Sequence, residues 1–288
     1  SAASDNKPMQ FIVPFGPGGS GDISARMLAE WITKKTGRSV VVENKPGANG
    51  IIGVEAARKA PADGSVLLLA TTSTHLANPY LFKKLPYDPG KDFRLVGTFG
   101  TGSFYILVNP SAPYKTLANF VQAAKANPGK LNYGYFNATS SVTAAMFAAT
   151  AGITLTGVPY KQVGQAMTEL MAGQIQVVFT DSVQGDPFVT SGQLHALAVH
   201  SAARLKRFPN IPLFRESYPK FDVSAGFLGV AVPAATPVAT QQELNDMIND
   251  AVTSEPVKSR LEGFGFTPYR ASLADLVGEV ANTIAGNA

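Results

Sequence analysis

A glycine-rich turn near the start of the chain is the clearest candidate for binding chemistry. Residues 16–22 read GPGGSGD, and a helix-forming segment follows them. Glycines let a backbone approach a ligand closely, and the first amides of a helix donate hydrogen bonds to anions. The spacing Gly16-x-Gly18-x-x-Gly21 also matches the dinucleotide fingerprint, with Glu43 about 22 residues further on. An anion site, a nicotinamide site and a purely structural turn all stay open.

Pro17 argues against the dinucleotide interpretation, because it removes one backbone donor and fixes φ inside the loop. The chain also contains no GxxxxGK[ST] segment, so nucleoside triphosphate binding has little support. A nicotinamide-dependent oxidoreductase that uses the loop from Gly16 to Gly21 is nevertheless kept as the alternative function.

Side chains that could assemble a catalytic centre are few. The chain has no cysteine, which excludes thiol catalysis and cysteine-ligated zinc, and it has no GxSxG segment. Its three histidines are His75, His195 and His200. The last two are five residues apart in a predicted strand, so we expect them on opposite faces. The sequence therefore predicts a protein that is not an enzyme and that uses no cofactor or metal.

Composition sets the class of protein. The chain has 288 residues, of which 45% are hydrophobic and 15% charged, so it can fill one or two α/β domains. Its net charge of +4 comes from scattered lysines and arginines, which suits anionic solutes and not nucleic acid. No segment is apolar for long enough to cross a bilayer. The polar start, residues 1–7, resembles a processed end, so we expect that a signal peptide was removed.

Strands and helices alternate along the chain. Ser20 or Asp22 is expected to cap the first helix, and Gly37 to end it. The alternation predicts parallel, doubly wound sheets with right-handed crossovers, although one sheet with a helical tail fits the pattern almost as well. Predicted strands are 9–13, 40–42, 66–70, 105–108, 131–133, 158–160, 177–179, 195–200 and 229–232; predicted helices are 23–35, 52–60, 116–127, 141–151, 165–172, 240–254, 255–263 and 272–285.

An ordered set of short motifs runs through the whole chain. Residues 13–22, VPFGPGGSGD, are followed by VENKPGANG at 42–50 and LPYDP at 85–89. Further motifs are ADG at 62–64, KDF at 91–93, PGKLNY at 128–133, VPYK at 158–161 and LAV at 197–199. In order and approximate spacing the set resembles the extracytoplasmic receptors of tripartite tricarboxylate transporters, often called Bug-type receptors, whose opening motif is VPFxPGGxxD. In that family the segment at Glu43 begins a turn and is not a ribose ligand.

The resemblance implies a two-lobed, periplasmic-binding-protein-like (type II) α/β fold. Each lobe would be a doubly wound, mostly parallel sheet, with the ligand cleft between the lobes. Residues 1–102 and 229–288 would form lobe 1, and residues 103–228 lobe 2. The implied protein is a periplasmic monomer that closes its lobes on a small organic carboxylate. It then delivers this ligand to the membrane subunits of a tripartite tricarboxylate-type transporter.

The resemblance also implies that backbone amides, hydroxyls and waters hold the carboxylate without an obligatory arginine. Hydrogen bonds to a charged group contribute about 1.5–3 kcal/mol each. We expect Asp22 to fix its loop and not to touch the anion. Helix capping, a solvated loop and a structural His75 are the alternatives. The candidates are Phe15, Gly18, Gly19, Ser20, Asp22, Thr72, Ser73, Thr74 and His75 in lobe 1, and Phe136, Ala138, Thr139, Ser140, Ser141, Tyr160, Lys161, Thr180 and Asp181 in lobe 2.

Several aromatic residues depart from the family pattern. Tyr135 and Phe136 stand where small residues are usual, and Phe227 where tryptophan is common. Aromatic surface near a cleft can stack on a flat ring. The ligand is therefore hypothesised to be an aromatic mono- or dicarboxylate, and the alternative is that Tyr135 and Phe136 pack inward.

Overall fold

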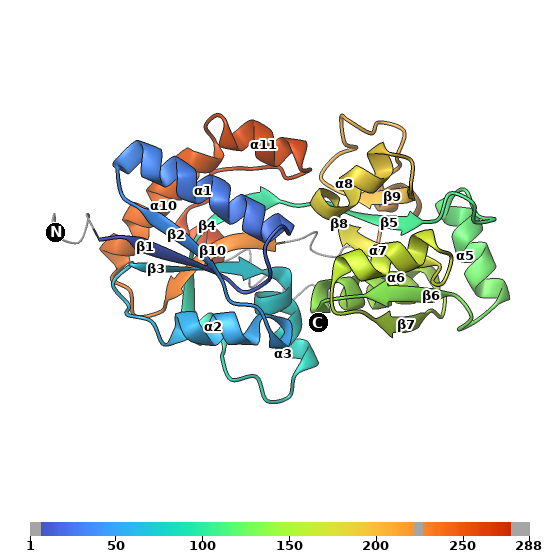
Figure 1. Ribbon diagram of the computed structural model, residues 1–288, viewed down its shortest axis with the longest axis horizontal. Coiled ribbons are helices and arrows are strands. Elements are labelled where there is room, and N and C mark those ends of the chain that lie inside the picture. The colour runs from blue at the N-terminus through green and yellow to red at the C-terminus, as the bar shows by residue number, and fades with distance from the viewer. Residues whose placement is uncertain (1–6, 222–226, 278–288) are drawn as a thin grey trace. The chain divides into compact units, whose positions relative to one another are not determined.

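Two five-stranded sheets, each in its own unit, organise the part of the chain described by the computed structural model, residues 7–221 and 227–277. The units are Ser1–Thr101 with Phe227–Ala288, and Gly102–Gly226. Both sheets are doubly wound and mostly parallel, as predicted, and the single-sheet alternative is wrong (Figure 1). None of the helices in these residues is long and apolar enough to cross a membrane.

The sheet of the first unit has the strand order β2-β1-β3-β10-β4. Strand β1 pairs in parallel with β2 and β3, whereas β10 runs antiparallel to β3 and β4. Every residue of β10 is buried, because the strand is central and covered on both faces. The strands are β1 Met9–Val13, β2 Val40–Asn44, β3 Val66–Thr71, β4 Phe93–Thr101 and β10 Phe227–Pro233.

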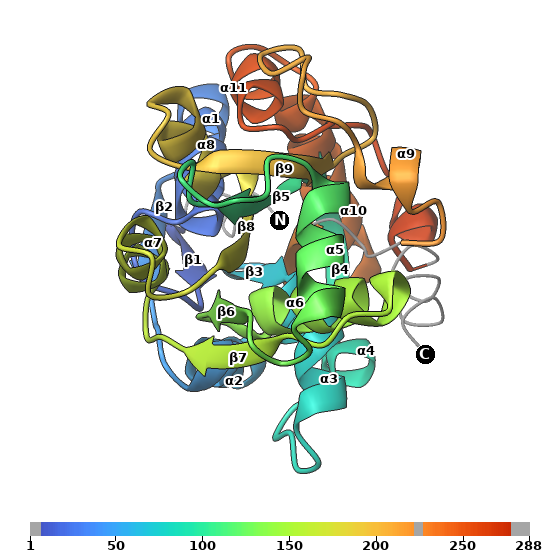
Figure 2. The same ribbon diagram turned by 90° about the vertical axis from the view of Figure 1, so that its right-hand side faces the viewer.

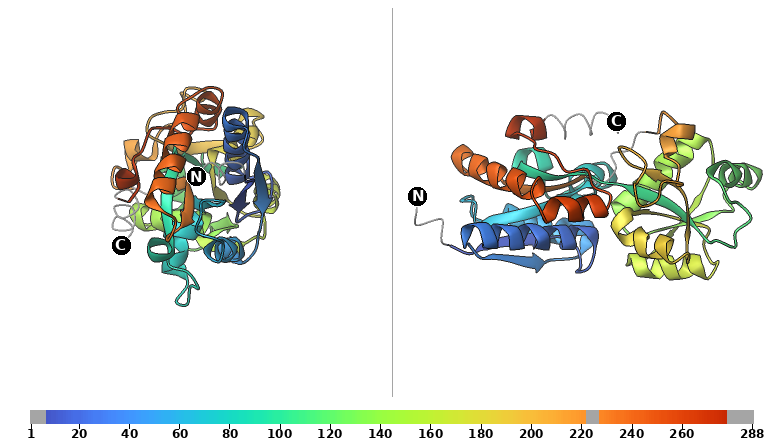
Figure 3. Two further views of the ribbon diagram at one scale, coloured as in Figure 1. Left: turned by 90° about the vertical axis from the view of Figure 1, so that its left-hand side faces the viewer. Right: turned by 90° about the horizontal axis from the view of Figure 1, so that it is seen from above.

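Helices cover both faces of this sheet. Helices α1 and α10 contact each other on one face, and α2 contacts β3 and β10 on the other (Figures 1 and 3). Adjacent β3 residues, Leu68 and Leu69, are both fully buried because they point to opposite faces. The helices are α1 Ser20–Thr36, α2 Ile51–Arg58, α3 Asn78–Leu81, α4 Pro89–Asp92, α10 Val238–Val252 and α11 Val257–Gly263, with short turns η1 Ala48–Gly50 and η2 Thr72–Ala77.

The second sheet repeats this design with the order β7-β6-β8-β5-β9. Strand β5 runs antiparallel to β8 and β9, and β6 runs parallel to β7 and β8. Figure 2 shows α5 and α6 on one side of the sheet, and α7 and α8 on the other. The elements are β5 Phe104–Val108, α5 Leu117–Ala126, β6 Asn132–Tyr135, α6 Ala138–Ala151, β7 Thr156–Pro159, α7 Val163–Met171, β8 Val177–Asp181, α8 Ser182–Thr190, β9 His195–His200 and α9 Phe214–Ser217.

The structure can be compared with the local expectations at several points. The N-cap of α1 is Gly19, without a side-chain hydrogen bond, and not Ser20 or Asp22; its end at Gly37, in the left-handed region with φ 73°, is confirmed. Strand β4 was not predicted. Strand β10 begins at Phe227, before the boundary expected at residue 229. The predicted helix 272–285 lies largely outside the described residues.

Candidate functional site

Three loops of the first unit meet where the parallel strands β1, β2 and β3 end. Asn44, the last residue of β2, donates from Nδ2 to the carbonyl oxygen of Phe15 at 3.0 Å. A Cβ atom on Gly50 would lie 2.7 Å from Thr74 Cγ2 and 3.2 Å from the Phe15 ring. The loops after all three strands are therefore packed together at one edge of the sheet, where α/β proteins usually bind ligands.

Asp22 holds the loop between β1 and α1 in place. Its carboxylate, only 5% exposed, accepts hydrogen bonds from Gly18 N at 3.0 Å, Asn44 Nδ2 at 3.0 Å and Arg26 Nε at 3.1 Å. Burial alone would raise the pKa of Asp22, but these donors outweigh it and the pKa lies below its usual value. The carboxylate is thus committed within the protein, which agrees with the loop-fixing role expected for it.

The amino end of α1 keeps uncommitted donors. Its first hydrogen bond within the helix joins Ile23 N to Gly19 O at 3.0 Å. Within the described chain, no side chain caps this end, and the backbone amides of Ser20, Gly21 and Asp22 have no acceptor. Gly21 lets the helix begin close to β3, because a Cβ there would lie 2.5 Å from Leu69 Cδ2. Three amides and the positive end of the helix dipole therefore remain available to an anion.

The turn η2, after β3, is buried and internally bonded. The hydroxyl of Thr71 accepts from Thr74 N at 3.1 Å, and that of Thr74 accepts from Thr71 N at 3.0 Å. Thr72 Oγ1 accepts from Phe227 N at 2.7 Å. The hydroxyls of Thr72 and Thr74 thus bind the protein's own backbone. Because Thr72, Ser73 and Thr74 are all buried, the solvated-loop alternative is wrong.

His75 is a neutral, buried side chain. Its Nδ1 lies 3.0 Å from Thr74 Oγ1, and its ring centroid lies 5.8 Å from that of Phe93. Burial lowers the pKa of His75 to about 4, so the imidazole carries no charge near neutral pH. This environment favours the structural interpretation of His75 over contact with an anion.

The loop after β2 was missed as a part of this edge. Four consecutive residues, Gly47 to Gly50, have positive φ angles of 127°, 50°, 55° and 88°. Asn78 Nδ2 donates to Asn49 O at 3.0 Å and so ties the loop to the residue that follows η2. Two glycines flanking two other residues were a usable signal for this turn. Positive φ at Ala48 and Asn49 was not predictable, because it is uncommon in residues other than glycine.

In the second unit, α6 is capped by its own sequence. Asn137 Oδ1 accepts from Ser140 N at 2.8 Å, and Ser140 Oγ accepts from Phe136 N at 3.1 Å and Asn137 N at 3.3 Å. Asn137 was not among the predicted residues. Both the amide and the hydroxyl of Ser140 are therefore committed to capping. Of its predicted neighbours, Ala138 is buried, Thr139 is half-buried and Ser141 is half-buried.

The end of β8 presents a second buried polar group. Asp181 caps α8 by accepting from Gln184 N at 3.0 Å. Burial raises the pKa of Asp181 to about 6, with a smaller contribution from the charge of Asp186, although backbone donors oppose the rise. Thr180 is 4% exposed, and its Oγ1 has no partner among the described residues. The starts of α6 and α8 thus differ from that of α1, whereas α7, whose N-cap is Gln162, also lacks a side-chain cap.

The remaining candidates of the second unit lie beside its core. Phe136 and Tyr160 are partly buried against the cluster that contains Tyr105. The ring of Tyr135 lies 5.8 Å from that of Tyr133. Lys161 is exposed. The rings of Phe136 and Tyr135 thus have protein neighbours, which favours the inward-packing alternative for these two residues.

The chemistry of other ligand classes finds less support. Glu43, which a ribose would need, accepts from Gln10 Nε2 and pairs with Lys45 at 2.9 Å. Among residues 7–221 and 227–277 no group of three or more histidine, aspartate or glutamate side chains could hold a metal ion. The candidate residues instead form two groups, one at the strand ends of each unit.

Comparison with known proteins shows to which family the chain is similar. A family model described as "Tripartite tricarboxylate transporter family receptor" matches residues 24–286. Protein BugT of Bordetella pertussis (strain Tohama I) is 33% identical over 96% of this chain and 86% of its own length. An R. palustris protein solved with adipate is 26% identical, with a TM-score of 0.90 over 97% of this chain and 94% of that one. MatC from Rhodopseudomonas palustris, solved with bound malate, is 27% identical, with a TM-score of 0.87 over 98% and 97%.

Proposed function

Since the chain belongs to the tripartite tricarboxylate transporter receptor family, we propose that it is a periplasmic receptor for a small organic carboxylate. The protein passes this ligand to the membrane subunits of such a transporter and acts as a monomer without catalysing a reaction. Two neighbouring structures contain the dicarboxylates adipate and malate, which supports this ligand class. The oxidoreductase alternative finds no support among the matched proteins.

The observation that carries the proposal is the uncapped start of α1. Its amides at Ser20, Gly21 and Asp22 are the strongest site for one carboxylate group. We assign the rest of the ligand to the loops of the second unit, near Thr139, Tyr160 and Asp181. A ligand that contacts both units stabilises a closed arrangement over an open one by its extra contacts in that state. An aromatic acid remains a candidate, but the neighbours of Tyr135 and Phe136 reduce the reason for preferring it.

Substitution Gly19→Asp tests this site directly. Gly19 has φ −79° and ψ 173°, an extended conformation that aspartate adopts readily. Its carboxylate would cap α1 and occupy the amides that we assign to the ligand. We expect ligand binding to weaken at least a hundredfold, whereas the free energy of unfolding rises by roughly 0.3 kcal/mol, since glycine is already an acceptable N-cap. Calorimetric titration with adipate, malate, benzoate and phthalate, together with urea unfolding, measures both quantities.

The matched control is Gly16→Asp, in the same loop. A Cβ at Gly16 would meet no atom within 4 Å, so the variant adds the same charge without capping the helix. It should lose far less affinity than Gly19→Asp. Equal affinity of wild type and Gly19→Asp for a carboxylate would contradict the assignment of the α1 amides. If wild type bound none of these acids, whereas nicotinamide cofactors raised its thermal stability, the receptor proposal itself would fail.

A further inference from the structure

Residues 79–92, which run from within α3 to the start of β4, expose apolar side chains that the candidate site does not use. Tyr80 is 51% exposed and Leu81 is 47% exposed. Of the large hydrophobic residues exposed in the described chain, only these two are adjacent in sequence. In Figures 1 and 2 the part between α3 and α4 projects beyond the rest of the first unit. We call residues 79–92 the projecting segment.

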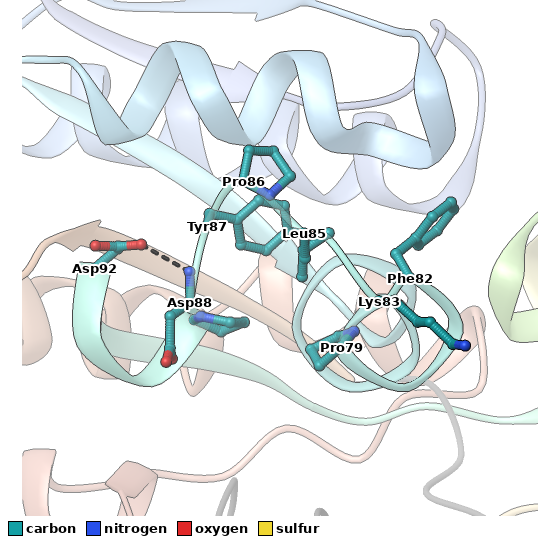
Figure 4. Close-up of a pocket in the computed structure, with 9 residues that line it drawn as sticks. Pro79, Phe82, Lys83, Leu85, Pro86, Tyr87, Asp88 and Asp92 are labelled. Atoms are coloured by element: carbon teal, nitrogen blue, oxygen red, sulfur yellow. Dashed lines mark hydrogen bonds between the residues drawn. The ribbon is translucent and has the colours of Figure 1, made fainter.

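Prolines and the buried Tyr87 restrict the conformation of the projecting segment. A hollow of about 480 Å³ runs along it, lined by three prolines together with Phe82 and Leu85 (Figure 4). Tyr87 anchors the segment, because its ring is buried and its hydroxyl donates to Thr74 O at 2.6 Å. Tyr80 and Leu81 are the last residues of α3, and the prolines before and after them fix φ at three positions of the segment.

The lysines and the aspartates of the projecting segment differ in whether they already have partners. Lys83 and Lys84 are exposed, and neither forms an ion pair within residues 7–221 and 227–277. Its carboxylates already have backbone donors: Asp88 accepts from Gly90 N at 3.0 Å, and Asp92 accepts from Asp88 N at 2.7 Å, as Figure 4 shows. The lysines are therefore uncommitted cations beside exposed apolar groups, whereas the aspartates maintain the turn of α4.

We propose that the projecting segment binds peripherally to an anionic lipid surface. Tyr80 and Leu81 would enter the headgroup boundary, where aromatic and leucine side chains are favourable, and the two lysines would face the lipid charges. Each lysine near an anionic surface raises binding about fivefold. One short loop gives weak, reversible attachment. This inference goes beyond the proposed receptor function. The two are connected only in that a receptor held at the membrane would find its transporter sooner.

The composition favours lipid over a protein partner. A specific protein interface covers about 800 Å² on each partner, and its centre is depleted of lysine. Here Phe82, which is partly exposed, and then two lysines follow the exposed apolar pair, and Leu85 comes next. Exposed apolar residues beside lysines are typical of segments that lie in a membrane interface.

Cosedimentation with vesicles of equal parts phosphatidylethanolamine and phosphatidylglycerol tests the proposal on the full chain. We expect wild type to sediment with these vesicles and not with pure phosphatidylcholine, and to be released by high salt. The double variant Lys83→Glu/Lys84→Glu should lose more than tenfold in partition coefficient. Variant Tyr80→Ser/Leu81→Ser should also lose binding, although the lysines remain.

The matched control is Lys34→Glu/Lys35→Glu in α1, which changes the net charge equally at another lysine pair. It should retain binding within about threefold, since its lysines adjoin no exposed apolar pair. Equal losses in both double variants, or no binding of wild type to phosphatidylglycerol, would overturn the proposal. So would binding that requires membrane proteins. Carboxylate titration of each variant, with thermal unfolding, separates this result from the receptor function, which should be unaffected.

Discussion

At the scale of single residues, the surroundings of two buried carboxyl groups, Asp22 and Asp181, shift the pKa in opposite directions. Burial opposes ionisation of both, but the donors to Asp22 include the cation Arg26 and its pKa is lowered, whereas Asp181 has backbone donors and the like charge of Asp186, and burial raises its pKa to about 6. Both carboxylates lie at helix starts, yet only Asp181 caps its helix. The same residue type therefore fixes a loop in one unit and closes a helix in the other.

His75 gives the stability of the protein a defined pH dependence. Its pKa is about 4 in the folded state and 6.5 in the reference state, because burial disfavours the charged ring. Between these values the unfolded chain binds a proton that the folded chain does not, so stability falls as pH decreases from 6.5 to 4. The loss from this residue should approach about 3 kcal/mol.

Urea unfolding of His75→Gln across this pH range checks the prediction. The variant should show a flatter pH dependence than wild type, whatever its stability at neutral pH. His195, which is exposed, provides the matched control, and His195→Gln should follow the wild-type curve. Parallel curves for wild type and His75→Gln would show that His75 does not titrate as its burial requires.

At the scale of elements, glycines decide how closely helices approach the site. A Cβ on Gly53, in α2, would lie 2.8 Å from Pro14 Cα and 2.9 Å from Lys45 O, and backbone atoms cannot rotate away. Gly53→Ala should therefore destabilise the protein by about 1–3 kcal/mol, despite the better helix propensity of alanine. Gly164, in α7, has no atom within 4 Å of such a Cβ. Gly164→Ala should stabilise by about 0.5–1 kcal/mol. Thermal and urea unfolding of both variants test this contrast.

The sequence pattern predicted most elements because their hydrophobic spacing is regular. It failed at β4, whose residues FRLVGTFGT contain two glycines, an unusual composition for a strand. Gly97 is nevertheless required there, because Ile248 of α10 fills the space beside it. Because Ile248 lies 151 positions after Gly97, the residues around Gly97 carry no sign of this contact.

The candidate site was predictable in part. The loop before α1 and the segment after β3 both carried a pattern, glycines in one and hydroxyls in the other. Their roles did not follow from residue type. The hydroxyls of Thr72 and Thr74 bond to backbone amides, and Gly19 matters because, without a side chain, it leaves the first amides of α1 uncapped. Such assignments depend on which donors are already satisfied, and that is known only after folding.

At the scale of the whole molecule, the family and the two mostly parallel sheets confirm the predicted fold class. Lobe closure is a proposal that solution scattering can test. Adding a carboxylate that binds in calorimetry should reduce the radius of gyration of wild type. Variant Gly19→Asp at the same ligand concentration should keep the value of the unliganded protein. An unchanged radius in a saturated wild type would contradict closure while leaving binding intact.

The place of β10 between β3 and β4 bears on how the chain acquires its structure during synthesis. When residue 221 has left the ribosome, every strand of the second sheet exists, but the first sheet still lacks an inner strand. The later-made unit can thus assemble before the earlier one, whose β4 waits for a neighbour encoded more than a hundred positions downstream. A chain cut short at that point would leave unpaired strand edges in its first unit, a surface open to aggregation.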